Sequence, residues 1–395
     1  MKKYIKTCVA MLMIIATLGS LFGCSSPDLE DTAELIAPYT EGCPISSIRT
    51  GIYRQGIYAL ENGFECTENG TYYMCMFGGG HWLLYSDHGS DTVIKLCGRP
   101  DCTHSDRDCN AYFETGVNIC YYEGYLYTYG KEGSAKGIIR LDLDGSNRVL
   151  VYNLSEFMSE NGSGGLVNPR IWNGIFSVGL KKLNSAGEEV YERYYYKLDG
   201  SMQSPQRTST MGFVKNDGNV FCGVIGYDSD NQQYIYGKWN PDDGTSTELF
   251  RDSKMCTTGY IGSDAIYYIE NGIIYKFSYD TKSKTALFDT GLQGNSYQLS
   301  CFPDMVVVSD YVDVSTGDSL EKLTMYFYDW KFNSLGSVDI DYELAPVLSG
   351  VICGETHERL ILTDSTKCIP RYYINKEDLG TGKIKINKYT LIDLE

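Results

Sequence analysis

The sequence has few histidines, few prolines and too few basic residues to balance its acids. Its 395 residues include 4 His and 10 Pro, and 34 Lys and Arg stand against 51 Asp and Glu, for a net charge of −17. This charge repels phosphate backbones, so we expect no nucleic-acid partner. The chain also lacks Gly-x-Ser-x-Gly and His-Glu-x-x-His motifs, and four histidines leave few candidates for a His-based triad. No catalytic residue is predicted.

The first 23 residues read as a targeting segment. A basic start is followed by an apolar stretch from Cys8 to Leu21, which is too short to span a bilayer. The sequence Leu21-Phe22-Gly23-Cys24 resembles the lipobox of bacterial lipoproteins, which implies lipid attachment at Cys24. We predict a signal peptide at 1–23, a polar tether at 24–50, and anchoring to the outer face of the cytoplasmic membrane. An ordinary signal peptide cut elsewhere is the alternative.

Short runs of aromatic and β-branched residues alternate with Gly, Asn, Asp and Ser along the rest of the chain. This pattern is typical of strands and tight turns, and helical periodicity is almost absent. A unit of four strands recurs about seven times, with about 48 residues per unit. We predict an all-β fold, a single β-propeller of four-stranded blades over residues 51–395. Seven blades are favoured, with six or eight as alternatives, and either 52–60 or 383–394 closes the ring.

Two resemblances support this prediction. Tyr125-Leu126-Tyr127 and Ile266-Tyr267-Tyr268, with the strands that follow them, resemble blades of low-density-lipoprotein-receptor-type propellers. The chain is also similar to an uncharacterised family of clostridial-type surface lipoproteins, most specifically in Leu96-Cys97-Gly98-Arg99-Pro100-Asp101-Cys102-Thr103-His104 and Cys109-Asn110-Ala111-Tyr112-Phe113. This similarity implies a lipobox and a propeller-like repeat, and it implies no activity.

The same segment carries the clearest chemical motif. Cys97, Cys102, His104 and Cys109 are thiol and imidazole ligands of the kind that zinc selects, and four of them complete a tetrahedral structural site. We predict a structural zinc in a loop at 97–109. Two alternatives stay open: a disulfide among Cys97, Cys102, Cys109 and Cys120, or free thiols.

In a four-stranded meander the second turn and the link to the next blade emerge on one face. The Gly78-Gly79-Gly80 segment and the 97–109 loop therefore share a face, and long loops on a scaffold favour binding. We predict that His81 and Trp82 contact a ligand there, with packing of the aromatic ring as the alternative. The favoured function is a non-catalytic extracellular binding platform for a glycan, peptide or protein. The alternative is a secreted carbohydrate-active hydrolase or lyase on the same face. Glycosidases need only two catalytic carboxylates, and the sequence does not show which of the 51 Asp and Glu residues could serve.

Overall fold

The computed structural model describes most of the chain beyond residue 62. The described residues are 63–105, 108–160, 166–172, 174–183, 187, 189–208, 212–215, 221–228, 230–252, 260–261, 265–293, 297–302, 304–310, 322–341, 352–356, 358–363 and 369–392. The predicted signal peptide at 1–23, the tether at 24–50, Cys24 and the strand at 52–60 lie outside these residues.

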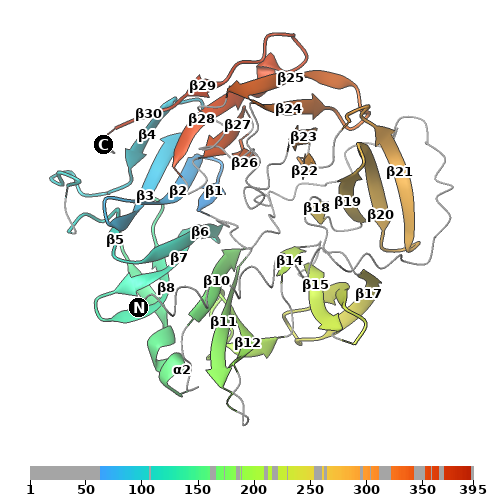
Figure 1. Ribbon diagram of the computed structural model, residues 1–395. Coiled ribbons are helices and arrows are strands. Elements are labelled where there is room, and N and C mark those ends of the chain that lie inside the picture. Colours follow the sequence, from blue (N-terminus) through green and yellow to red (C-terminus); the bar gives the residue numbers. More distant parts are fainter. Residues whose placement is uncertain are drawn as a thin grey trace, which may run out of the picture. The chain divides into compact units, whose positions relative to one another are not determined.

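Within the described residues the strands form seven sheets, numbered here in chain order (Figure 1). The first contains β1 (Phe64–Cys66), β2 (Gly70–Phe77), β3 (Gly80–Asp87), β4 (Thr92–Lys95), β5 (Tyr112–Phe113) and β30 (Thr390–Leu391). The second contains β6 (Gly116–Tyr122), β7 (Tyr125–Glu132), β8 (Ala135–Leu141) and β9 (Val149–Asn153). The third contains β10 (Leu166–Trp172), β11 (Ile175–Leu183), β12 (Glu189–Lys197) and β13 (Gln206–Thr208).

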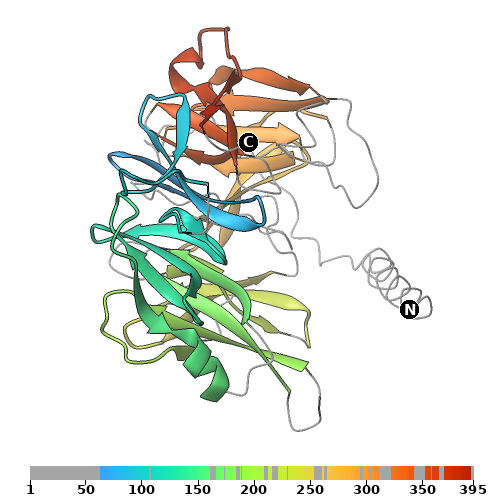
Figure 2. The same cartoon turned by 90° about the vertical axis from the view of Figure 1, so that its left-hand side faces the viewer.

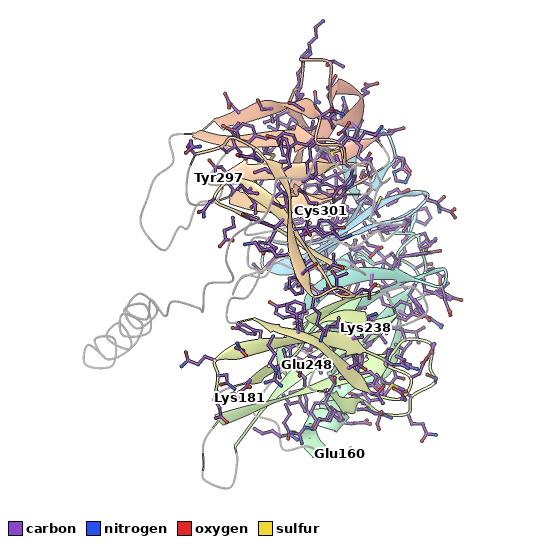
Figure 3. The ribbon with its side chains drawn as sticks, turned by 90° about the vertical axis from the view of Figure 1, so that its right-hand side faces the viewer. Glu160, Lys181, Lys238, Glu248, Tyr297 and Cys301 are labelled. Carbon is purple, nitrogen blue, oxygen red and sulfur yellow. The ribbon has the colours of Figure 1, made fainter. Side chains whose placement is uncertain are left out.

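The remaining four sheets have the same order of strands. The fourth contains β14 (Gly212–Lys215), β15 (Phe221–Asp228), β16 (Gln233–Trp239) and β17 (Ser246–Asp252). The fifth contains β18 (Tyr260–Ile261), β19 (Ala265–Glu270), β20 (Ile273–Ser278) and β21 (Ser283–Asp289). The sixth contains β22 (Tyr297–Cys301, both labelled in Figure 3), β23 (Val306–Asp310), β24 (Lys322–Tyr328) and β25 (Ser334–Asp341). The seventh contains β26 (Ile352–Glu355), β27 (Arg359–Thr363), β28 (Pro370–Asn375) and β29 (Asn387–Lys388).

Local sequence explains the tight turns of these meanders. Asn271 and Gly272 join β19 to β20 with φ values of 51° and 78°, the left-handed conformation that two-residue hairpins require. Gly145 (φ 79°) and Gly200 (φ 74°) lie between the third and fourth strands of their sheets. A residue with a Cβ is strained in this conformation, so glycine favours reversal of the chain at these points.

Neighbouring sheets share hydrophobic clusters in a closed order. Each cluster joins consecutive sheets, and the seventh sheet packs on the first. Representative pairs in chain order are Tyr72 with Ile119, Tyr127 with Phe176, Tyr195 with Trp239, Tyr236 with Ile266, Tyr267 with Trp330, Phe327 with Leu360, and Ile361 with Tyr73. The first strands also contact one another, β1 with β6 and β26, and β6 with β10 (Figure 1). Such a cycle of meander sheets is a β-propeller.

The C-terminal segment takes part in two sheets. β29 pairs with β28 and is the fourth strand of the seventh sheet, whereas β30 pairs in parallel with β4 of the first sheet. The N–H groups of Thr390 and Ile392 donate to the carbonyls of Asp91 and Val93 at 2.7 and 3.0 Å. Among the described residues the C-terminal segment joins the last sheet to the first, as one of the two predictions for closing the ring held, and the other, 52–60, lies outside them.

Two short helical segments complete the described structure. Helix α2 (Leu154–Glu160) follows β9 and packs on β8 (Figure 2). Its Leu154 and Phe157 side chains are buried. A 3-10 turn, η3 (Lys376–Asp378), follows β28. Among the described residues no helix is long and apolar enough to cross a membrane.

Candidate metal centre

The predicted Cys/His loop is an insertion in the outer edge of the first sheet. β4 and β5 both pair with β3, β4 at Leu84 and Tyr85 and β5 at His81 and Trp82. Leu83 closes the base of the loop, because its N–H donates to the Ala111 carbonyl at 2.8 Å and its carbonyl accepts the Leu96 N–H at 2.9 Å. The sheet therefore sets both ends of the loop beside the Gly78–Gly79 turn between β2 and β3.

The loop brings together the four residues that the spacing singled out. One ligand atom each from Cys97, Cys102, His104 and Cys109 lies within 4.8 Å of all the others. The Cys109 sulfur lies 3.5 Å from Nδ1 of His104. In a tetrahedral zinc site with Zn–S bonds of about 2.3 Å, sulfur atoms lie about 3.8 Å apart. The four side chains thus form a Cys3His cluster of the right size to hold a metal ion.

Backbone N–H groups point at the sulfur atoms. The N–H of His104 lies 3.4 Å from Sγ of Cys102, and the N–H of Ala111 lies 3.4 Å from Sγ of Cys109. His104 adopts this position with a φ of 55°, in the left-handed region that residues other than Gly, Asn and Asp enter at a cost. N–H groups directed at sulfur stabilise thiolate ligands.

The thiols differ in acidity. Burial opposes ionisation of Cys97, but N–H groups of Arg99 and Asn110 that donate to its sulfur, together with the neighbouring thiols, bring its pKa below the ordinary value. Burial raises the pKa of Cys109 to about 12. Without a metal, Cys109 is therefore protonated at neutral pH. A bound metal would displace that proton, as metals do from thiol ligands generally.

Three basic residues surround the cluster in a protein that is otherwise strongly acidic. Nζ of Lys95 donates to the His104 carbonyl at 2.7 Å, and Nη1 of Arg99 donates to the Asp108 carbonyl at 2.8 Å. Burial lowers the pKa of Arg148, against the opposing charges of Glu132 and Cys109. Three thiolates and one Zn²⁺ carry a net charge of −1, and these cations offset it.

The fourth thiol named in the disulfide alternative lies elsewhere. Cys120 belongs to β6 and to the cluster shared by the second, third and fourth sheets, whereas Cys109 packs in the cluster shared by the first and seventh. Cys97, Cys102 and Cys109 are thiols in the structure. A disulfide that includes Cys120 is therefore excluded by this arrangement.

The structure corrects the ligand-binding prediction for Trp82. Its ring is only 6% exposed, stacks on Phe77 at 5.7 Å and meets the edge of Tyr112 at 5.2 Å. Nζ of Lys95 lies 4.1 Å from the ring centroid. No face of the indole is left for a sugar ring, so Trp82 is a packing residue, as the alternative held. His81 is half-buried on the other face of β3.

Two side chains of the site were not predicted from sequence. Lys95 reaches both Trp82 and the loop carbonyl of His104, and Arg148 lies 4.0 Å from the Phe113 ring and donates to the Tyr112 carbonyl at 2.8 Å. Lys95 ends β4 just before the loop, and this closeness in sequence was the available signal. Nothing in the sequence near Arg148, which precedes β9 in the second sheet, points to the cluster.

The fold and the site together define a β-propeller with a Cys3His cluster inserted in the outer edge of its first sheet. No protein-family model matches the chain, and no curated protein matches it. The resemblance to clostridial-type surface lipoproteins therefore stays a prediction.

Several solved structures are similar to the chain at low identity. The uncharacterized protein lmo1340 from Listeria monocytogenes EGD-e is 11% identical, with a TM-score of 0.42 over 68% of this chain and 82% of that one. TolB from Acinetobacter baumannii is 13% identical, with a TM-score of 0.38 over 70% of this chain and 64% of that one. The β-propeller domain of the Trilobed protease from Pyrococcus furiosus is 10% identical, with a TM-score of 0.35 over 56% and 69%. These values carry no argument about function, and the propeller assignment rests on the closed cycle of sheets.

Proposed function

We propose that this protein is a seven-bladed β-propeller that acts as a non-catalytic binding platform. A structural zinc stabilises its Cys/His loop, and a lipid anchor holds it at the membrane surface. The observation that carries the proposal is the Cys3His cluster, whose four ligand atoms lie within 4.8 Å of one another. Four protein ligands complete the tetrahedral shell of zinc and leave no position for substrate, which is the pattern of structural sites. The metal then braces a loop instead of acting on a ligand.

The blade count is supported by the sheets themselves. Seven sheets occur within the described residues, and each contributes an antiparallel meander of four strands. In the first sheet the loop interrupts the outer strand, so β4 and β5 count as two parts of one blade strand. β30 is then an addition to the blade from the C-terminus.

Elemental analysis with a thiol count tests the zinc. The mature protein, purified without oxidant or chelator, is expected to hold about one zinc per chain. Cys102→Ser should lose the metal and about 3 kcal/mol of unfolding free energy, because the loop is no longer closed. Cys66→Ser, in β1 and outside the cluster, is the matched control and should keep the zinc. A metal-free protein whose cluster thiols all react in the folded state would overturn the proposal.

The anchor rests on the tetrapeptide Leu21-Phe22-Gly23-Cys24. In cells fed labelled palmitate, Cys24→Ser should abolish labelling and release the protein from membranes, since the lipid is attached to that sulfur. Cys43→Ser changes a thiol of the predicted tether and should leave labelling intact. Equal labelling of both variants would contradict the anchor.

The binding role is supported by the position of the loop, because β5 at its end pairs with His81 and Trp82 directly after the Gly78–Gly79 turn. Loops held by a rigid scaffold favour binding. Immobilised mature protein is expected to retain a cell-surface glycan or peptide from a defined array and to release it unchanged. Recovery of shortened glycan chains instead would indicate the hydrolase or lyase.

A further inference from the structure

The β2–β3 hairpin that carries the Cys/His loop has a second set of metal-ligand side chains on its other face. Met76 lies opposite His81 in the pairing of β2 with β3, and Met74 lies opposite Leu83. Successive side chains of a strand point to opposite faces, so Met74, Met76 and His81 share one face. Cys75 and Trp82 lie on the other, within the hydrophobic cluster that includes Cys109.

A glycine of β6 lies in close contact with two of these side chains. A Cβ placed on Gly116 of β6 would lie 3.0 Å from Sδ of Met74 and 3.3 Å from Cβ of His81. Both contacts are tighter than ordinary packing allows, so an alanine at this position would require Met74 or His81 to shift by a few tenths of an ångström. Met74 and His81 therefore both lie against Gly116, where the first sheet contacts the second.

The imidazole of His81 is oriented as a ligand. Nδ1 is buried and, among the described residues, has no hydrogen-bond partner. The ring also hydrogen-bonds to the backbone of Glu114, which must engage the other nitrogen. Burial lowers the pKa of His81, against that hydrogen bond, so the ring is neutral at pH 7 and Nδ1 carries a lone pair. Metal-bound histidines usually hold their second nitrogen on a backbone carbonyl in this way.

Solvent reaches the set through Met76. This side chain is 51% exposed, whereas Met74 is 4% exposed and belongs to the cluster shared by the first and second sheets. Two thioethers and one neutral imidazole carry no charge, and such soft ligands select monovalent soft cations over zinc or calcium. A net charge of −17 on the chain favours a cation at an uncharged site.

We propose that Met74, Met76 and His81 form a second metal site, separate from the Cys3His cluster, that takes a soft monovalent cation of the Cu(I) class. Met74 forms the buried floor, His81 supplies Nδ1, and Met76 closes over the ion from the solvent side. The site is independent of the zinc proposal, because its three ligands lie on the opposite face of the hairpin. No redox step is involved.

Silver(I), which shares the ligand preference of Cu(I) and does not change oxidation state under these conditions, is the probe. The zinc-loaded protein, with methyl-labelled methionine and ring-labelled histidine, is titrated with silver while both sets of NMR signals are recorded. Once the thiols are saturated, the methyl signals of Met74 and Met76 and the ring signals of His81 should shift together and saturate at one further silver per chain. His88, whose Nε2 lies 2.7 Å from the Thr67 carbonyl, is the internal control and should not move.

Variants separate the site from general metal uptake. Met76→Leu preserves an exposed apolar side chain and should weaken silver binding at this site about tenfold with unchanged thermal melting. Gly116→Ala should also weaken it, because the added methyl would displace the Met74 sulfur. Met158→Leu, in helix α2, is the matched control. The proposal is overturned if the Met74, Met76 and His81 signals stay fixed after thiol saturation, or if Met76→Leu binds silver as tightly as Met158→Leu does.

Discussion

Trp82 contributes to the stability of the first sheet and not to a binding surface. It lies between Phe77, Tyr112 and Lys95. At this position along β3 the pairing partner changes from β5 to β4. The same ring thus links the sheet to Lys95, which holds the carbonyl of His104 in the loop. Packing of the indole and closure of the Cys/His loop are coupled through one lysine.

We therefore expect Trp82→Ala to destabilise the protein without removing a ligand contact. The loss should be about 3–5 kcal/mol, as for large aromatic residues in a core, because the cavity is only partly refilled. Tyr121→Ala, at a ring that is 38% exposed, is the control and should change the unfolding free energy by about 0.5 kcal/mol or less. Chemical denaturation measures both. A stable Trp82→Ala protein that fails to bind its ligand would restore the ligand hypothesis.

Side chains close in sequence were the predictable part of the site. Cys97, Cys102, His104 and Cys109 lie in one loop, so their spacing alone indicated a shared ligand set. Arg148 was not predicted, because its contact with the Phe113 ring is made between two different sheets. Phe113 belongs to β5 of the first sheet, and Arg148 precedes β9 of the second. The burial of Trp82 likewise depends on Tyr112. Tyr112 follows the Cys/His loop in sequence and pairs with Trp82 through β5.

At the scale of elements, two departures from a regular meander occur in the first sheet. Its outer strand is split into β4 and β5 by the Cys/His loop, and β30 adds a parallel strand to β4. β5 pairs with β3 beyond the loop, and β30 pairs with β4 from the C-terminal end of the described residues. Leu391 of β30 also packs against the cluster shared by the first and seventh sheets. β30 thereby stabilises the contact between the seventh and first sheets.

Truncation after Tyr389 tests this closure. Removal of β30 deletes the hydrogen bonds of Thr390 and Ile392 to β4 and should cost about 2 kcal/mol of unfolding free energy. The amides of β4 should also exchange with solvent faster, because their edge becomes free. A chain that ends at Ile392 is the control and should match the 395-residue chain. Unchanged exchange in β4 after the longer deletion would show that β30 does not hold the edge.

At the scale of the whole molecule, tyrosine provides much of the packing between sheets. Burial raises the pKa of many of these phenols, and raises that of Tyr122 to about 12. The others with a raised pKa are Tyr72, Tyr85, Tyr127, Tyr129, Tyr152, Tyr195, Tyr196 and Tyr328. The folded protein keeps these phenols neutral at pH values where the unfolded chain ionises them.

Stability should consequently fall at alkaline pH. Above about pH 10 the unfolded chain loses phenol protons that the folded state retains, so unfolding becomes more favourable as pH rises from about 10 toward 12. Phenolate absorbance and far-UV circular dichroism, followed together, should show the buried phenols ionising only as the β signal is lost. Denatured protein, titrating near its ordinary pKa, is the control. Complete ionisation with an intact β signal would contradict the burial of these side chains.

The sequence by itself determined the features that depend on near neighbours. Turn residues such as Asn271-Gly272 act within a few positions, and alternating apolar residues indicate strands without reference to the rest of the chain. The Cys/His set also lies within one loop. Only the tertiary structure decided that β30 closes the cycle, that Trp82 is covered, and that Met74, His81 and Gly116 meet. These features arise from pairing and packing between segments far apart in the chain, which local sequence does not encode.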